Sequence, residues 1–169
     1  MEVLKEKNLK IGVATSSTRE HALDNFEREQ ITHYFDSIIT GEMIEHGKPE
    51  PDIYVESCRQ LKVDPKDAIA LEDAINGIRS AHGAGMNPVM IPDIVQDTSK
   101  VDALLFGKCK SLLEFAEILK SIKESLKNLD EKELSETLDF MNKLKADKNT
   151  SNSVSYTHLR AHETLSDLV

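Results

Sequence analysis

The sequence of 169 residues has no tryptophan, only two cysteines and an aromatic content of 5%. Cys58 and Cys109 lack the spacing of metal ligands, and we expect them to be reduced thiols of a cytoplasmic protein. Basic residues are also few, 21 against 30 acidic ones, and the formal charge of −9 argues against nucleic-acid binding, which depends on Lys and Arg neutralising phosphates. No apolar run approaches the roughly 18 residues of a membrane span. We therefore predict an acidic cytoplasmic protein with neither nucleic acid nor membrane as a partner.

The chain is long enough for one α/β domain, and short apolar runs alternate with segments of helical periodicity. This alternation predicts a mostly parallel sheet with flanking helices. We expect strands over residues 11–14, 35–40, 68–71 and 87–91, a short edge strand over 101–106, and helices over 18–30, 51–61, 74–83 and 111–119. The inner stripe of the helix over 51–61 is expected to comprise Tyr54, Val55, Cys58 and Leu61.

The C-terminal part of the chain differs in composition. Residues 120–150 are rich in Lys and Glu and predict a helical extension of the domain over residues 1–119. Residues 151–169 are expected to be disordered and not native, because 154–164 resemble a translated reading frame of a sequencing adapter. His158 and His162 are four residues apart and would otherwise suggest a metal pair. We exclude this tail from the reasoning about the fold.

A hydroxyl motif ends the first predicted strand. Thr15 is followed by Ser16 and Ser17 at the start of a predicted helix. A hydroxyl together with free backbone N–H groups at a helix N-terminus forms an anion site. Capping of the helix by Ser16, Ser17 or Thr18 is the alternative, and the motif considered alone favours capping.

A lysine motif, Gly47-Lys48-Pro49-Glu50-Pro51-Asp52, lies before the predicted helix over 51–61. Proline disfavours helix for the residue before it, so the two prolines predict a stiff loop. A lysine held in such a loop can direct its charge at a phosphate and at neighbouring carboxylates. A solvated loop lysine is the alternative.

An acidic pair, Glu72-Asp73, directly follows the apolar run over 68–71. Two carboxylates at the carboxyl end of a strand in a parallel sheet repel each other, so a nearby positive charge is needed to keep both ionised. Mg²⁺ supplies that charge when it binds one or two protein carboxylates. Asp73 as the N-cap of the next helix is the structural alternative. Since ligands bind beyond the carboxyl ends of parallel strands, all three motifs are expected at one edge of the sheet.

The order of these motifs, closed by Glu72-Asp73-x-x-x-Gly77, resembles the haloacid dehalogenase-like (HAD) phosphohydrolases, in the branch of β-phosphoglucomutase and small sugar-phosphate phosphatases. The resemblance covers residues 1–119. It implies a Rossmann-like parallel sheet and a phosphatase or phosphomutase that acts on a small phosphorylated metabolite with Mg²⁺ as cofactor.

The resemblance also implies roles for individual residues. Thr15, helped by the backbone at Ser16, would bind the transferring phosphoryl group. Lys48 would steady the phosphate and the nucleophilic aspartate, and Glu72 with Asp73 would hold Mg²⁺. Ala74 departs from the serine that often follows the acidic pair in this family.

The first motif of the family is missing from this sequence. Family members begin with an apolar strand and Asp-x-Asp, which supplies the nucleophile and the acid–base group of an aspartyl-phosphate mechanism, and a cap domain follows. Asp24, Asp36 and Asp93 lack the required strand and partner, so no nucleophile is assigned. We expect a fragment that lacks the first strand and the cap, is inactive alone and is poorly stable. The missing strand would lie between the strands that end at Thr15 and Glu72.

Two other classes of function compete with this interpretation. A phospho-receiver domain also uses acids, a hydroxyl and a lysine, but it places the acidic pair first, whereas here the pair comes last. A non-catalytic α/β module that binds phosphate and Mg²⁺ remains the alternative.

Overall fold

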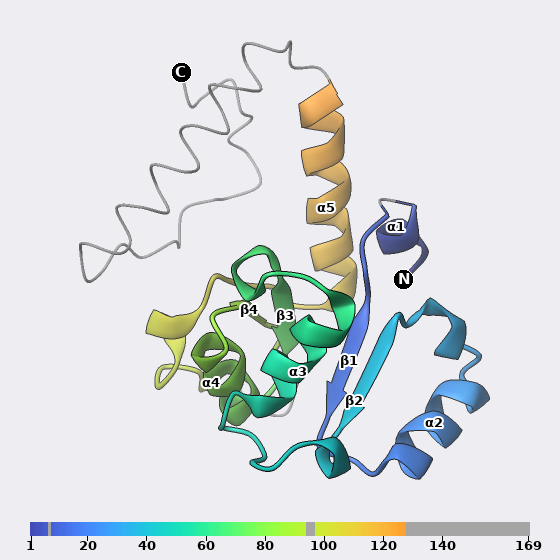
Figure 1. Ribbon diagram of the computed structural model, residues 1–169. Helices are drawn as coiled ribbons and strands as arrows, with labels where there is room; N and C mark the ends of the chain where they lie inside the picture. The colour runs from blue at the N-terminus through green and yellow to red at the C-terminus, as the bar shows by residue number, and fades with distance from the viewer. Residues whose placement is uncertain (7, 94–96, 128–169) are drawn as a thin grey trace. The chain divides into compact units, whose positions relative to one another are not determined.

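The computed structural model describes residues 1–6, 8–93 and 97–127, along which strands and helices alternate (Figure 1). The helices are α1 (Glu2–Lys5), α2 (Arg19–Arg28), α3 (Asp52–Leu61), α4 (Ile75–Gly83) and α5 (Leu112–Lys127). The strands are β1 (Gly12–Thr15), β2 (Ser37–Thr40), β3 (Ile69–Glu72), β4 (Asn87–Met90) and β5 (Gly107–Lys108). Single turns of 3-10 helix lie at η1 (Thr32–Tyr34), η2 (Gly41–Met43), η3 (Pro65–Asp67) and η4 (Asp102–Leu104).

The strands form two separate parallel sheets within the described residues. β1 pairs only with β2, in a register that places Thr15 opposite Thr40, and the second sheet has the order β3-β4-β5. The prediction of parallel strands with flanking helices is therefore confirmed. The two sheets are not hydrogen-bonded to each other, so β1 and β3 each have one unpaired edge. We predicted a missing strand between them, and the break in the sheet lies at that position.

One layer of helices nonetheless connects the two sheets. α3 packs on β1 and β2, α4 packs on β3 and β4, and the two helices contact each other (Figure 1). The main buried cluster therefore has members from both sheets and both helices: Ile39, Ile53, Tyr54, Ala70 and Ala81. A second cluster, Ile78, Met90 and Val101, lies under α4 and η4. Side chains from both sheets thus share one core, although the backbones of the sheets do not pair.

Two predictions about local structure were wrong. The edge strand expected over 101–106 is the single turn η4, since the Leu104 N–H bonds to the Val101 carbonyl at 2.8 Å, and pairing with β4 begins only at β5. Val55 is 48% exposed because it lies off the stripe that buries Ile53, Tyr54 and Cys58. Tyr54 and Cys58 are four positions apart and therefore share a face of α3, whereas Val55 is turned about 100° from Tyr54 around the helix axis.

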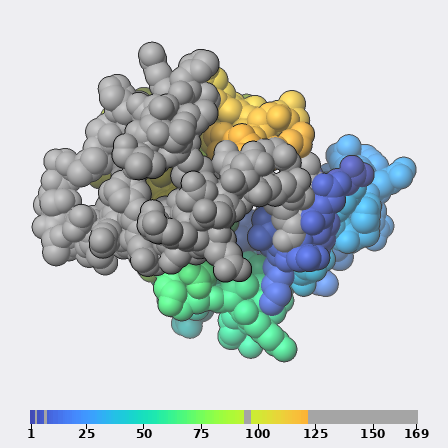
Figure 2. Space-filling view, turned by 90° about the horizontal axis from the view of Figure 1, so that it is seen from above, coloured from blue at the N-terminus to red at the C-terminus, as the bar shows by residue number. Residues whose placement is uncertain are grey.

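The N-terminal residues are anchored on the segment before β2. The Asp36 carboxylate accepts hydrogen bonds from the Lys5 ammonium and from the Ile11 backbone N–H, both at 2.7 Å, and the Tyr34 hydroxyl lies 3.3 Å from Glu2 Oε1. In Figure 2 the dark blue N-terminal residues lie beside the lighter blue residues that precede β2. Asp36 therefore serves to fasten the chain ahead of β1.

The chain divides into two compact units after Leu112, and the first unit, Met1–Leu112, contains β1 to β5. The predicted helical extension is described only as far as Lys127, and the predicted tail with His158 and His162 lies outside the described residues. None of the described helices combines the length and apolar character that crossing a bilayer requires.

Candidate functional site

The loop between β2 and α3 is fastened on both sides of Lys48. Before Lys48, the backbone nitrogen of His46 lies 3.1 Å and its ring Nδ1 3.0 Å from Oδ2 of Asp52, the first residue of α3. The hydrogen bond from His46 is the main cause of the lowered pKa of Asp52. Near the end of the loop, the fully buried Ser80 of α4 donates from its hydroxyl to the Glu50 carbonyl at 2.5 Å. Lys48 lies between these two fixed points, so the predicted stiffness of the loop comes from specific contacts as well as from its prolines.

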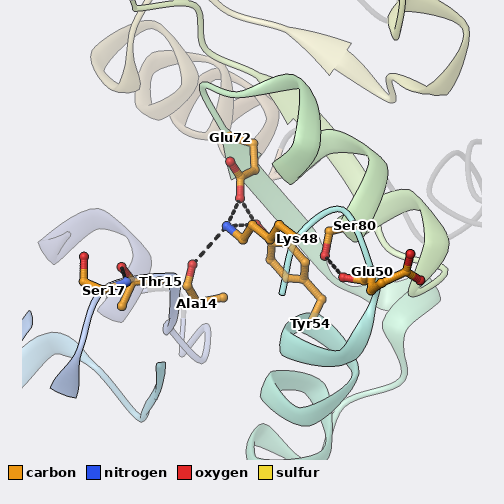
Figure 3. A network of polar contacts seen from close by, with 8 residues as sticks. All are labelled: Ala14, Thr15, Ser17, Lys48, Glu50, Tyr54, Glu72 and Ser80. Carbon is orange, nitrogen blue, oxygen red and sulfur yellow. Dashed lines mark hydrogen bonds and ion pairs between the residues drawn. The ribbon is translucent and has the colours of Figure 1, made fainter. Parts of the chain in front are cut away.

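The side chain of Lys48 crosses from the loop to both sheets (Figure 3). Its ammonium donates to the Ala14 carbonyl of β1 at 3.1 Å and to the Glu72 carboxylate at the end of β3. It also lies 3.5 Å from the Tyr54 hydroxyl and 5.0 Å from the centre of the Tyr54 ring. Lys48 is only 15% exposed. The carboxyl ends of β1 and β3 therefore meet at a single, largely buried positive charge.

Glu72 is the buried member of the acidic pair. Its carboxylate is 8% exposed and accepts from both Lys48 and the Tyr54 hydroxyl through Oε1. The other face of the carboxylate lies against the bare Cα of Gly77, where an added methyl group would overlap it. Burial raises the pKa of Tyr54 far above its ordinary value, and the charges of Glu72 and Asp73 add to the shift, so the phenol stays protonated as a donor.

Asp73, the next residue, has different surroundings. Its side chain is exposed and makes no hydrogen bond or ion pair with any described residue. Neighbouring side chains at a strand end point to opposite sides, which accounts for the contrast with Glu72. The alternative role of Asp73 as a helix cap is not observed, since the N-cap of α4 is Ala74 and no side chain bonds there.

The hydroxyl motif lies at the carboxyl end of β1, beyond Ala14 in Figure 3. Thr15 Oγ1 accepts from the Ser17 backbone N–H at 3.1 Å. The helix cap is Thr18, whose Oγ1 accepts from the His21 N–H at 3.4 Å. Capping of α2 is therefore assigned to Thr18, and Thr15 and Ser16 are left for another role.

The turn after β2 passes close to this motif. A Cβ on Gly41 would lie 2.9 Å from the Ser16 carbonyl oxygen, so only glycine permits this approach. One residue further on, Glu42 Oε2 accepts from the Arg19 N–H of α2 at 2.8 Å. The segments that follow β1 and β2 are therefore in close contact with each other.

The structure thus brings Lys48 and Glu72 into direct contact. Thr15 and Ser16 lie at the carboxyl end of β1, and Asp73 follows the carboxyl end of β3. Sequence reasoning missed the Tyr54 hydroxyl and the Ser80 hydroxyl as parts of this arrangement. The sequence marks Tyr54 only as an inner-face residue of a helix. A buried tyrosine usually finds a partner for its hydroxyl, and that rule is the signal that could have identified it.

Mg²⁺ fits the chemistry of the acidic pair, because it prefers carboxylate oxygens and fills its other positions with water and phosphate. Asp73 offers an exposed carboxylate with no other partner among the described residues, whereas Oε1 of Glu72 is already engaged. The described residues contain no group of three or more His, Cys, Asp or Glu arranged for a metal. These residues by themselves could therefore supply at most a part of a metal site.

The described parallel strands carry a hydroxyl, a lysine contact and two carboxylates at or just beyond their carboxyl ends. The family model described as haloacid dehalogenase-like hydrolase matches residues 1–91. The chain belongs to this family, as the resemblance of its motifs predicted.

Several characterised relatives are similar over part of the chain. A phosphorylated carbohydrates phosphatase of Thermotoga maritima is 32% identical over 126 residues, which are 75% of this chain and 57% of the relative. A β-phosphoglucomutase of Bacillus subtilis is 40% identical over 83 residues, 49% of this chain and 36% of the relative.

Solved structures agree with these relatives. CbbY from Rhodobacter sphaeroides in complex with phosphate has a TM-score of 0.59 and 29% identity, over 69% of this chain and 52% of that protein. β-Phosphoglucomutase from Clostridium difficile has a TM-score of 0.60 and 27% identity, over 73% of this chain and 53% of that protein. The chain spans about half the length of these relatives.

Proposed function

We propose that this chain is the carboxyl-terminal part of a Mg²⁺-dependent phosphatase or phosphomutase that acts on a small phosphorylated metabolite such as a sugar phosphate. The observation that carries the proposal is the Lys48 ammonium at the meeting point of β1 and β3. A fixed, largely buried positive charge beside strand-end hydroxyls is suited to a phosphate group. The names of the relatives, a phosphatase of phosphorylated carbohydrates and a β-phosphoglucomutase, favour a sugar phosphate as the substrate.

Each residue has a role in this proposal. Thr15 and the backbone at Ser16 bind the phosphoryl oxygens. Lys48 offsets part of their charge by exchanging one of its three acceptors, Ala14, Tyr54 or Glu72, for a phosphoryl oxygen. Asp73, with or without Glu72, holds Mg²⁺, which when bound offsets further negative charge on the phosphate. The nucleophile is not among the residues of this chain, and we propose that it enters on a strand between β1 and β3.

The proposal is tested with a longer protein in which the upstream strand and cap, recovered by sequencing the source DNA across the start of the reading frame, precede Met1. Phosphate release from sugar phosphates with Mg²⁺ is measured for this protein and for the 169-residue chain. Turnover is expected only in the longer protein, because a covalent route needs the nucleophile.

Two substitutions in the longer protein test the assigned residues. Lys48→Ala and Asp73→Ala are each expected to lower kcat by at least about 10²-fold, the usual effect of removing one group that stabilises transition-state charge. Lys66→Ala is the matched control, because that lysine is 72% exposed and, within the described part of the chain, pairs with Asp64 at the surface. Near-native turnover in either variant would refute its role. Binding of phosphate and Mg²⁺ without any turnover in the longer protein would instead favour the non-catalytic module.

A further inference from the structure

The Tyr54 hydroxyl occupies a position that no part of the proposed function requires. α3 carries Tyr54 into the main buried cluster, and the side chain is only 6% exposed. The ring makes the core contacts that any aromatic residue could make. The hydroxyl, however, ends at Glu72 Oε1, the same oxygen that accepts from Lys48 (Figure 3). This placement suggests a role for the hydroxyl itself.

The hydrogen bonds around this hydroxyl can be assigned a direction. A carboxylate only accepts, so Tyr54 donates its proton to Glu72, and the phenolic oxygen is then able to accept from Lys48. The ammonium of Lys48 has three donors, and Ala14, Tyr54 and Glu72 provide three acceptors. Lys48, Tyr54 and Glu72 therefore form a closed group in which the charge of Glu72 is matched by that of Lys48.

The position of the Glu72 carboxylate is fixed on its other side as well. Gly77 of α4 leaves just enough room for the carboxylate, which is almost completely removed from water. To reach a cation outside, Glu72 would have to give up two hydrogen bonds and leave Lys48 without its counter-ion. A buried charge that loses its partner is strongly disfavoured.

We propose that Tyr54 is a positioning residue that keeps Glu72 as the counter-ion of Lys48, so that Glu72 is withheld from the cation and cation binding depends on Asp73. The two adjacent carboxylates then have separate tasks, set by the alternation of side chains at the end of β3. This inference rests on the proposed function only in placing a cation site at the acidic pair.

The experiment measures the affinity of the 169-residue chain for Mn²⁺, a spectroscopic substitute for Mg²⁺, by water-proton relaxation. Asp73→Asn is expected to weaken binding by at least about tenfold, because the site loses a charged ligand. Glu72→Gln is expected to change the affinity by less than about twofold, since this carboxylate does not reach the ion. An equal loss in both variants would overturn the proposal.

Tyr54→Phe removes only the hydroxyl and is the variant that separates positioning from core packing. It is expected to raise the affinity for Mn²⁺ by about threefold or more, because the carboxylate, no longer held by Tyr54 but still paired with Lys48 through Oε1, can turn its second oxygen towards the ion. The gain should disappear when Tyr54→Phe is combined with Glu72→Gln. Tyr34→Phe is the matched control and should leave the affinity unchanged, since among the described residues the Tyr34 hydroxyl bonds to Glu2, at the surface. An unchanged or weaker affinity in Tyr54→Phe would overturn the role of Tyr54.

A second measurement tests the contact between Tyr54 and Glu72 independently of metal binding. Urea unfolding of Tyr54→Phe, Glu72→Gln and the double variant is expected to show coupling of at least about threefold in the unfolding constant, as for residues in one network. If the unchanged chain has no affinity for Mn²⁺, the role of Asp73 in this inference fails, while the proposed function is still decided by turnover of the longer protein and the coupling still decides whether Tyr54 and Glu72 act together. If Glu72→Gln does not fold, Tyr54→Phe and Asp73→Asn still give opposite predicted shifts.

Discussion

Replacing Gly77 by alanine sets two effects of opposite sign against each other. Gly77 lies in the first turn of α4, and alanine favours a helix over glycine by up to about 1 kcal/mol. The structure predicts a larger effect in the other direction, because the new methyl group would overlap the Glu72 carboxylate. That carboxylate is the end of a flexible side chain, but it cannot move without losing its contacts with Lys48 and Tyr54.

The net effect can be estimated from these contributions. Overpacking of a filled site costs about 1–3 kcal/mol, and a disturbed hydrogen bond to a charged group costs about 1.5–3 kcal/mol. After the gain in helix propensity of about 1 kcal/mol is subtracted from their sum, Gly77→Ala should lower the free energy of unfolding by about 1.5–5 kcal/mol. With a urea dependence of about 2 kcal/mol/M, the unfolding midpoint should fall by roughly 1–2 M.

The assay is urea unfolding followed by far-UV circular dichroism, because the chain has no tryptophan to report on folding. Gly83→Ala is the matched control in the same helix, since a Cβ there would meet Pro51 at an ordinary contact distance of 3.6 Å. This control should be as stable as the unchanged chain or more stable, by up to about 1 kcal/mol.

A second background identifies the cause of the loss. In a chain that already carries Glu72→Ala, the space beside Gly77 is open, and Gly77→Ala should no longer destabilise. The reasoning is refuted if Gly77→Ala is as stable as the unchanged chain, or if it destabilises both backgrounds equally.

Two further predictions concern stability. Ser80→Ala leaves the Glu50 carbonyl without its buried donor and should lower the free energy of unfolding by about 1–3 kcal/mol, measured by urea unfolding; an effect below about 0.5 kcal/mol would contradict the assigned hydrogen bond. The pKa of Asp36 is lowered, chiefly by the hydrogen bond from Lys5 and then by that from Ile11, so its stabilising contribution is complete above its ordinary pKa of about 4 and is lost as the pH falls through the lower folded-state value. Stability should therefore fall in this acidic range, and thermal unfolding of Asp36→Asn should show a smaller fall; an identical pH profile for both proteins would rule out the contribution.

The sequence by itself determined the class of fold and where to look for the site. Alternating apolar runs and helical segments predicted parallel strands with flanking helices, and the order of the motifs predicted the family. The rule that ligands meet the carboxyl ends of parallel strands correctly placed Lys48 and Glu72 at one edge. The roles of Thr15, Ser16 and Asp73 in binding phosphate and metal stay predictions.

The tertiary structure decided which partner each residue at that edge contacts. Whether Tyr54 reaches Glu72 depends on α3 lying across the first sheet while α4 places Gly77 beside the end of β3. Periodicity shows that a side chain is buried, but the partner it meets is set by contacts between elements distant in sequence. For the same reason the sequence presented Glu72 and Asp73 as one pair, and only the packing around β3 separated a buried counter-ion from an exposed carboxylate.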